Sequence, residues 1–381
     1  MTMDTSQFLP RTKVVKADNP TIPGTEILGI DLGYSSIKTS FGKGYVTIPG
    51  FCRRMKGELF GQLADNDIVY EADGMRYQVG QLALSSLKPG ENVDEASFYG
   101  REHYLRNEFL VQFRTAAALS FWNHEITSPL KVTTGLPPAY IDEDSDYLKG
   151  ALAGQHTFTV HWGSQTKKFS FTVERDDIDT IIQPMGTFFS VGMNDKGEMT
   201  PLLKKYWSSN VMIFDGGFGT LDIYLLRGNE VERSTTDDNL GMKRVFDEVR
   251  KALYKDHNIS VTIPEIMSCL GTGKIRRVNK KTLSAEEIDF SSYIKTANRI
   301  VAQEALDSIR MDLGSVDNLV LTGGTGAAWF HIFEDKLKNL TSAGVLNLIP
   351  GNAMNLSLPY YLSNVRGYYL KRYYQEAHRK A

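Results

Sequence analysis

Cysteine is scarce in this chain of 381 residues, which contains only Cys52 and Cys269. The two cysteines lie far apart and have no metal-ligand spacing. The sequence therefore contains neither a cysteine zinc motif nor the disulfide framework of a small secreted domain. We expect a protein of a reducing compartment, the cytoplasm.

Long apolar runs and an excess of one charge are also lacking. No stretch approaches the roughly 18 consecutive apolar residues of a membrane-spanning helix, and residues 1–24 lack the apolar core of a signal peptide. The formal net charge is −2, so no global basic field exists for nucleic acid or anionic lipid. We expect no membrane contact and no direct contact with nucleic acid.

What is present indicates a globular protein with more than one domain. The chain is 41% hydrophobic and 23% charged, and its length exceeds one ordinary core. Helical patterns, for example over 102–124 and 240–254, are mixed with short buried strands, which predicts an α/β architecture. A capping-box pattern at 284–287 predicts the start of a helix.

The N-terminal residues 1–25 are polar and contain three prolines. They are predicted to form an extended arm, outside the globular domains. Two alternatives remain open for this arm: a disordered tail, or a segment that docks on a neighbouring subunit.

One stretch, NVMIFDGGFGTLDIYLLRGNE at 210–230, joins a buried strand to a glycine-rich turn and a second strand. The simplest interpretation is a β-hairpin with a loose turn. The alternative interpretation is a phosphate-binding turn, because glycines let backbone N–H groups approach an anion closely. Asp215 at the strand end is suited to hold Mg²⁺, directly or through water.

A second stretch, ILGIDLGYSSIKTSFGKGYV, has the same layout near the N-terminus. Asp31 and Lys38 are seven positions apart, as are Asp215 and Asp222, and the two leading aspartates are 184 apart. Two such hairpins, one in each half, predict two related domains that face each other. Their glycine-rich turns would then clamp a polyphosphate from both sides of a cleft.

A third glycine-rich turn, Leu321–Gly326, again follows a buried strand and opens a helix. It is either a plain strand–helix turn or a cover for a nucleotide base or ribose. The three turns, in this order and at these separations, resemble those of the actin-like ATPase superfamily. The resemblance covers roughly residues 26–375, with 31–38 and 215–222 as its two phosphate motifs and 321–326 as its adenosine motif.

This resemblance implies an actin-like fold, with two related α/β domains around a nucleotide cleft. Each domain would have an RNase H-like core and a smaller subdomain. The expected bounds are 26–185 plus 358–381 for domain I and 186–357 for domain II. The turn Thr134–Pro137 and the second phosphate motif are similar to those of the plasmid-segregation actins of the ParM type.

The resemblance also implies a ligand, ATP with Mg²⁺, and leaves GTP open as an alternative. Lys38 would meet the β- and γ-phosphates, and Asp31 and Asp215 would hold the metal through its waters, because Mg²⁺ dehydrates reluctantly. Gln183 would position the attacking water, which makes Gln183 and Asp215 the catalytic candidates. The remaining predicted nucleotide contacts are Gly33, Tyr34, Ser35, Ser36, Gly216, Gly217, Phe218, Gly219, Thr220, Gly323, Gly324, Thr325 and Gly326, with Gly241, Lys243 and Arg244 as weaker candidates.

The expected function is that of an ATPase that polymerises into filaments and segregates plasmid DNA, with hydrolysis driving filament disassembly. Its partners would be further copies of itself and a DNA-binding adaptor at a plasmid centromere. Two alternatives share the fold: a chaperone-like or regulatory ATPase that never polymerises, and a small-molecule kinase.

Overall fold

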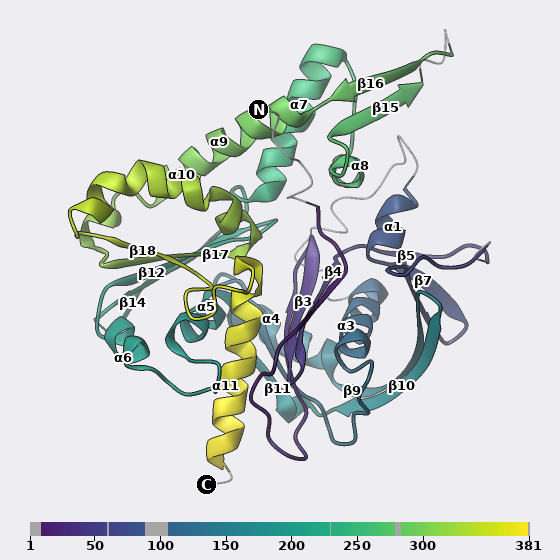
Figure 1. The fold of residues 1–381 in the computed structure, drawn as a ribbon, viewed down its shortest axis with the longest axis horizontal. Helices are drawn as coiled ribbons and strands as arrows, with labels where there is room; N and C mark the ends of the chain where they lie inside the picture. The colour runs from purple at the N-terminus through teal and green to yellow at the C-terminus, as the bar shows by residue number, and fades with distance from the viewer. Residues whose placement is uncertain (1–8, 59–60, 88–105, 229, 279–282, 380–381) are drawn as a thin grey trace.

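The computed structural model describes residues 9–58, 61–87, 106–228, 230–278 and 283–379. Two large sheets stand on either side of a central pair of helices (Figure 1). The first sheet has the strand order β1-β4-β3-β2-β8-β11. Its strands are β1 (Lys13–Lys16), β2 (Ile27–Leu32), β3 (Ser36–Phe41), β4 (Gly44–Pro49), β8 (Lys131–Leu136) and β11 (Ile178–Ile182).

The second large sheet repeats this layout in the other half of the chain, with the order β14-β13-β12-β17-β18. In both sheets three antiparallel strands are followed by two parallel ones. The fold therefore contains two related α/β domains, as predicted. The strands of this sheet are β12 (Val211–Gly216), β13 (Leu221–Arg227), β14 (Glu230–Asp237), β17 (Asn318–Thr322) and β18 (Asn347–Pro350).

Two helices, α5 (Gln183–Gly192) and α11 (Ser363–Arg379), fill the space between the two sheets (Figure 1). A shared apolar core connects α5 and α11 with strands of both sheets, including Ile27 on β2 and Val320 on β17. The helices approach closely, because a Cβ atom on Gly367 would lie 1.6 Å from the carbonyl oxygen of Gly186. Only glycine fits at this crossing.

Smaller elements cover the outer faces of the two sheets. Helix α3 (Asn107–Ser120) packs between the first large sheet and a five-stranded sheet of order β10-β9-β6-β7-β5. The strands of this sheet are β5 (Cys52–Arg54), β6 (Ile68–Ala72), β7 (Met75–Val79), β9 (Gly154–Trp162) and β10 (Gln165–Val173). The shorter helices α1 (Gln81–Ser85) and α4 (Ile141–Leu152) complete this half. The helix predicted over 102–124 is thus confirmed as α3, although its first residues, 102–105, lie outside the described part of the chain.

The second half has its own helical layer. The helical pattern predicted over 240–254 is confirmed as helix α7 (Met242–His257), which buries five apolar residues, Met242, Val245, Phe246, Val249 and Leu253. The other elements of this half are α6 (Pro201–Trp207), α8 (Ile263–Cys269), α9 (Ser291–Ser308), α10 (Gly323–Ser342) and the ribbon of β15 (Lys274–Val278) with β16 (Ala285–Asp289). No helix within the described ranges is both long and apolar enough to cross a bilayer.

The prediction of a helix start at 284–287 is wrong, because these residues enter strand β16. Glu287 lies opposite Arg276 on β15 and forms ion pairs with Arg276 and Lys274. Ile288 is buried in the core of this half. Cross-strand pairing and burial therefore override the local capping pattern.

The described part of the N-terminal arm docks on its own chain, an arrangement that neither sequence-based alternative contained. Strand β1 pairs antiparallel with β4 and adds a sixth strand to the first sheet. Asn19, further along the arm, also binds the first sheet, because its Nδ2 donates to the carbonyl of Phe41 at 2.6 Å. Tyr369 Oη on α11 donates to the carbonyl of Pro20 at 2.7 Å. The domain boundary between residues 185 and 186 stays a proposal, placed within α5.

Candidate functional site

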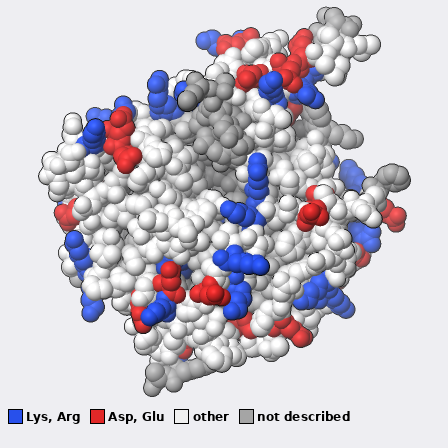
Figure 2. All heavy atoms as spheres, viewed as in Figure 1, with Lys and Arg blue, Asp and Glu red and all other residues white. Residues whose placement is uncertain are grey.

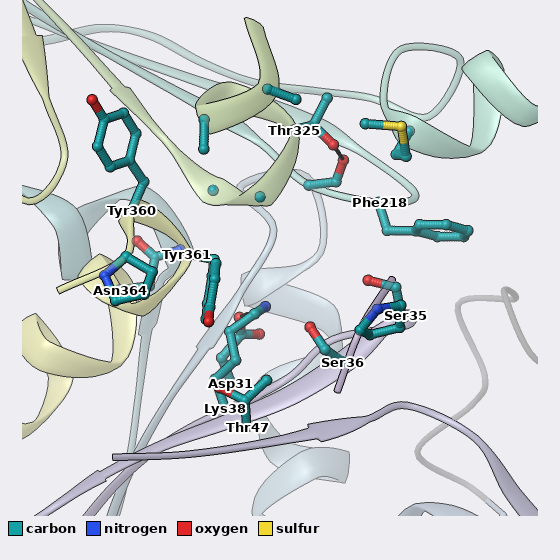
Figure 3. Close-up of a pocket in the computed structure, with 18 of the residues that line it drawn as sticks. Asp31, Ser35, Ser36, Lys38, Thr47, Phe218, Thr325, Tyr360, Tyr361 and Asn364 are labelled. Atoms are coloured by element: carbon teal, nitrogen blue, oxygen red, sulfur yellow. Dashed lines mark hydrogen bonds and ion pairs between the residues drawn. The ribbon is translucent and has the colours of Figure 1, made fainter. Parts of the chain in front are cut away.

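A cavity of about 610 Å³ lies where the turns of the two large sheets meet. Figure 3 shows the open space in this cavity bordered by Ser36 and Lys38 on one side and by Thr325 on the other. Phe218 and Tyr361 lie at its two ends in this view. Both halves of the chain therefore contribute to one site.

The first hairpin supplies an ion pair. Lys38 on β3 is the direct cross-strand partner of Asp31 on β2, and its Nζ lies 2.8 Å from Asp31 Oδ2. Both side chains are largely shielded from solvent. Ser35 in the connecting turn and Ser36 at the start of β3 line the cavity. The Ser35 carbonyl is held by the Gly50 N–H at 2.8 Å, which fixes the turn against the end of β4.

The second hairpin supplies two buried carboxyl groups. Asp215 on β12 and Asp222 on β13 are direct cross-strand partners. Burial raises the pKa of Asp215 to about 6, with the nearby Asp31 adding to the rise and the hydrogen bond from Asn364 opposing it. Burial and the Asp215 charge raise the pKa of Asp222 well above its usual range. The two hairpins are thus matched in backbone but differ in charge.

Asn364, at the start of α11, is a site residue that the sequence analysis missed. Its Nδ2 donates to Asp215 Oδ2 at 2.6 Å. Its Oδ1 accepts from the backbone N–H of Thr187 at 3.1 Å and from the Thr187 hydroxyl at 2.7 Å. The same hydroxyl lies 2.8 Å from Thr322 Oγ1. Asn364 therefore joins both central helices to the end of strand β12.

The turn after β12 is held from the outside by its neighbours. The Gly217 carbonyl accepts from Thr325 Oγ1 at 2.5 Å and from the Met242 N–H at 3.3 Å. The Phe218 carbonyl accepts from the Lys243 N–H at 2.8 Å. The first N–H groups of α7 thus bind the back of the turn, and the turn's own face is left toward the cavity.

The two turns touch each other beside the cavity. A Cβ atom on Gly219 would lie 2.8 Å from the ring of Tyr34, so the ring packs directly on the glycine backbone. Burial, followed by the nearby Asp238 charge, raises the pKa of Tyr34 to about 12. Beside this contact lies a smaller cavity of about 80 Å³, lined by both turns and by Thr134–Pro137. Gln183 lines both cavities.

The third turn opens helix α10. Gly323 has φ +78°, and a Cβ atom there would lie 2.5 Å from Asp215 Oδ1. Glycine is therefore required on both conformational and steric grounds. Gly324 and Thr325 line the larger cavity, and Gly326 lies behind them, packed against Gly216.

Most of the predicted site residues come together at these two cavities. Those that line one or both are Asp31, Gly33, Tyr34, Ser35, Ser36, Lys38, Gln183, Asp215, Gly217, Phe218, Gly219, Thr220, Gly323, Gly324 and Thr325. Gly216, Gly241, Lys243 and Gly326 lie behind the turns and support them through the backbone. Arg244 forms an ion pair with Glu248 and lines a different cavity, on the outer side of α7.

Several lining residues had no signal in the sequence. Tyr360 and Tyr361 line the cavity just before α11. Thr47 lines the cavity because it is the cross-strand partner of Lys38. The arm contributes Leu9, Pro10, Arg11 and Lys13. A pattern of alternating strand residues at 44–49 could have indicated Thr47, but the other contacts depend on the tertiary fold.

The residues present fit a magnesium nucleotide. The described part of the chain contains no group of three or more His, Cys, Asp or Glu side chains able to hold a metal alone. Mg²⁺ usually binds through one or two carboxylates together with water and substrate phosphates. Asp31 and Asp215 both line the cavity and supply this number. Gly217 and Gly323 line the cavity with them.

Comparison with known proteins supports this interpretation of the fold. Residues 29–186 match the family model of the actin-like proteins' N-terminal domain. A ParM protein described as the non-polymerisable quadruple mutant of pCBH ParM has 21% identity and a TM-score of 0.69, with 92% of this chain and 99% of that chain covered. A 15-stranded ParM filament from Clostridium botulinum has 20% identity and a TM-score of 0.67, with the same coverage.

An archaeal actin homologue in complex with ADP has 15% identity and a TM-score of 0.58, with 94% of this chain and all of that chain covered. No curated protein sequence matches the chain. At these identities the solved structures show a shared fold over nearly the full length.

Proposed function

We propose that this chain, which has an actin-like fold and an N-terminal domain of the actin-like family, is an ATP-dependent, filament-forming protein that segregates plasmid DNA. The observation that carries the proposal is the pair of matched hairpins, one from each half, whose turns line the same cavity. Such a site couples the position of the two halves to the ligand between them.

The nucleotide would be held mainly by backbone groups and by one lysine. Lys38 offers a positive charge at the cavity wall, already oriented by Asp31 at 2.8 Å. The turns 33–36 and 218–220 would supply N–H groups for the phosphates, while the Gly217 N–H donates to the Thr220 carbonyl at 2.9 Å within its turn. The turn 323–326 would cover the adenosine. We propose ATP as the nucleotide, with GTP as the alternative, because backbone-lined turns discriminate weakly between bases.

Asp31 and Asp215 would hold Mg²⁺, through its waters, and the metal would supply charge neutralisation at the phosphates. The pKa of Asp215, about 6, leaves this carboxyl group ionised at neutral pH. The hydrogen bond from Asn364 and the nearby Lys38 charge oppose the rise in its pKa only in part. The Asp215 carboxylate is therefore available to bind a cation.

Gln183 is the proposed residue that orients the attacking water. It is the first residue of α5, and its backbone carbonyl accepts from Tyr368 Oη at 3.4 Å. It lines both the large cavity and the small one beside the two turns. An amide barely accepts a proton, so Gln183 positions the water without acting as a strong base, and slow turnover follows.

Filament formation would proceed by head-to-tail contacts between copies of the chain. Such contacts are heterologous and build open filaments when the rotation does not close. The likeness to a ParM filament structure supports self-association. We further propose that a DNA-binding adaptor joins the filaments to a plasmid centromere in the cytoplasm, because the net charge of −2 provides no basic surface field for DNA itself.

The test is 90° light scattering with a pelleting assay after addition of Mg²⁺-ATP to the purified chain. We expect a rise that requires nucleotide and a critical protein concentration, and its absence in Asp215→Ala. Asp146→Ala is the matched control, since this carboxylate is exposed and pairs only with Arg175 among the described residues.

The same assay separates the two alternatives. Flat scattering at all concentrations with continued ATP hydrolysis would refute the filament proposal and favour a regulatory or chaperone-like ATPase. ATP consumption that depends on an added small-molecule acceptor would favour a kinase.

A further inference from the structure

The N-terminal arm extends the row of side chains that contains Lys38. Antiparallel pairing places Asp31 opposite Lys38, Lys38 opposite Thr47, and Thr47 opposite Lys13. Residues directly opposite each other in antiparallel strands project from the same face of the sheet. All four line the large cavity. Lys13 therefore stands on the cavity face, two strands and about 10 Å from Lys38.

Arg11 belongs to the same face. Side chains alternate along an extended segment, so Arg11 and Lys13 point one way and Thr12 the other. In agreement, Arg11 and Lys13 line the cavity, whereas Thr12 Oγ1 lies near Gly80, where a Cβ atom would be 3.5 Å away. In Figure 2 basic side chains follow one another along the path of the darkest purple segment of Figure 1, the N-terminal end of the described chain.

The arm is held in place at both ends of this segment. Leu9 packs on the apolar core of the second half, close to Gly271. Strand β1 is hydrogen-bonded to β4 in the first half. The segment that carries Arg11 and Lys13 thus spans from one half to the other at the cavity.

The charges lining the cavity show what the two arm residues add. Within the described ranges, the charged residues that line it are Arg11, Lys13, Lys38, Asp31 and Asp215. Lys38 is already paired with Asp31, and Asp215 adds a second negative charge. Among the described residues Arg11 and Lys13 form no ion pair, and both side chains are exposed. Among the described residues that line the cavity, Arg11 and Lys13 are therefore the cations that are not already paired with a carboxylate.

We propose that Arg11 and Lys13 of the N-terminal arm are nucleotide-binding residues that contact the anionic phosphates of the bound nucleotide. This inference rests on the proposed nucleotide site. It assigns the arm a role in ligand binding within its own subunit, in addition to any role in contacts between subunits.

The experiment measures the Kd of Mg²⁺-ATP for the full chain and for the variants Arg11→Gln, Lys13→Gln and the double variant, by displacement of a fluorescent ATP analogue. Glutamine keeps the length and the strand backbone but removes the charge. We expect a loss of about three- to tenfold for each single variant, as is typical of partly exposed charge-assisted contacts. The double variant should also show a weaker dependence of Kd on salt.

Lys16→Gln is the matched control. Lys16 is exposed on the same strand, but it projects from the other face and does not line the cavity. Adenosine, which has no phosphate, is the matched ligand control and should bind all variants equally. Melting temperatures of the variants establish that the fold is retained.

Two outcomes would contradict the inference in different ways. If the wild-type chain binds Mg²⁺-ATP and the double variant binds it within twofold of both wild type and Lys16→Gln, the arm has no part in the site. If the wild-type chain binds no nucleotide, the proposed function is wrong and the inference falls with it.

Discussion

Asp215 and Asp222 face each other across strands β12 and β13, and both carboxyl groups are buried. The equivalent positions of the first hairpin are occupied by Asp31 and Lys38, which form an ion pair. The repeat therefore preserves the backbone and replaces an ion pair with two acidic side chains, and burial followed by the Asp215 charge raises the pKa of Asp222. In the absence of ligand, the second hairpin carries an electrostatic cost that a bound cation would relieve.

Replacing Asp215 by Asn should stabilise the ligand-free protein at neutral pH. Its pKa rises from 3.8 to about 6 on folding, so the folded state binds the proton more tightly and its stability falls as pH rises from 3.8 to 6. Above that range the ionised group costs up to about 3 kcal/mol. The gain in melting temperature should be present at pH 7.5 and absent below pH 3.8.

The same Asp215→Asn variant should lose the increase in melting temperature that Mg²⁺-ATP gives the wild type. Asp222→Asn is its control, because Asp222 is buried nearby but lines neither cavity. Asp222→Asn should also stabilise the ligand-free protein, yet respond to Mg²⁺-ATP like the wild type. A full ligand response in Asp215→Asn would contradict the assignment of Asp215 to the metal.

Replacing Lys38 by Met should weaken nucleotide binding by roughly tenfold or more, because it removes a buried point charge from the phosphates. It should also cost about 2–3 kcal/mol of stability, since it leaves the Asp31 carboxylate without its partner. Calorimetric titration and urea unfolding measure the two effects. Lys43→Met is the control, as its ion pair with Asp18 is exposed on both sides, and it should change neither quantity.

Asn364→Ala should destabilise the protein by about 2–3 kcal/mol, because it leaves the Thr187 N–H and one Asp215 oxygen without their buried partner. It should also raise the pKa of Asp215 further, since the Asn364 hydrogen bond opposes the rise. The pH at which ATP hydrolysis declines on acidification should move upward. The exposed Asn339 on α10 provides the control, Asn339→Ala, and an identical pH profile in both variants would speak against this role.

Gly219→Ala should reduce ATP turnover, because the new methyl group would lie 2.8 Å from the Tyr34 ring and push the two turns apart. The expected loss is about tenfold or more in kcat, given the sensitivity of such reactions to small displacements. Gly314→Ala is the control, since nothing lies within 4 Å of a Cβ atom there. Steady-state phosphate release measures both, and equal rates would exclude a role for the contact.

Gln183→Ala should slow hydrolysis by roughly tenfold or more and leave the Kd of Mg²⁺-ATP within about twofold. Filaments of this variant should persist longer after the ATP supply ends, which light scattering records directly. Filaments that disassemble at the wild-type rate would show that another residue orients the water.

The two hairpins could be predicted because their signals are local: an apolar run, an aspartate, a glycine turn and a second strand within about ten residues. Their repetition indicated two related halves, and the strand orders confirm this. Asn364 could not be predicted, because it reaches Asp215 across 149 positions of sequence. Nothing in the pattern around Asn364 distinguishes it from an ordinary helix start.

The N-terminal arm illustrates a second limit. The segment 13–16 is short and is flanked by polar residues. Its sequence alone therefore does not show which strand it pairs with. The pairing depends on the exposed edge of β4, which exists only once the first sheet has formed. The helix start predicted from the capping box at 284–287 is wrong for the opposite reason. There the local signal is clear, but pairing with β15 overrides it.

The glycine contact between α5 and α11 also limits how the sequence can evolve. Because Gly186 and Gly367 meet backbone to backbone, neither can gain a side chain unless the two helices move apart, and the halves of the molecule would move with them. A substitution at one glycine cannot be rescued at the other, which has no atoms left to remove. Variation among descendants of this chain should therefore accumulate around the two positions and leave both unchanged.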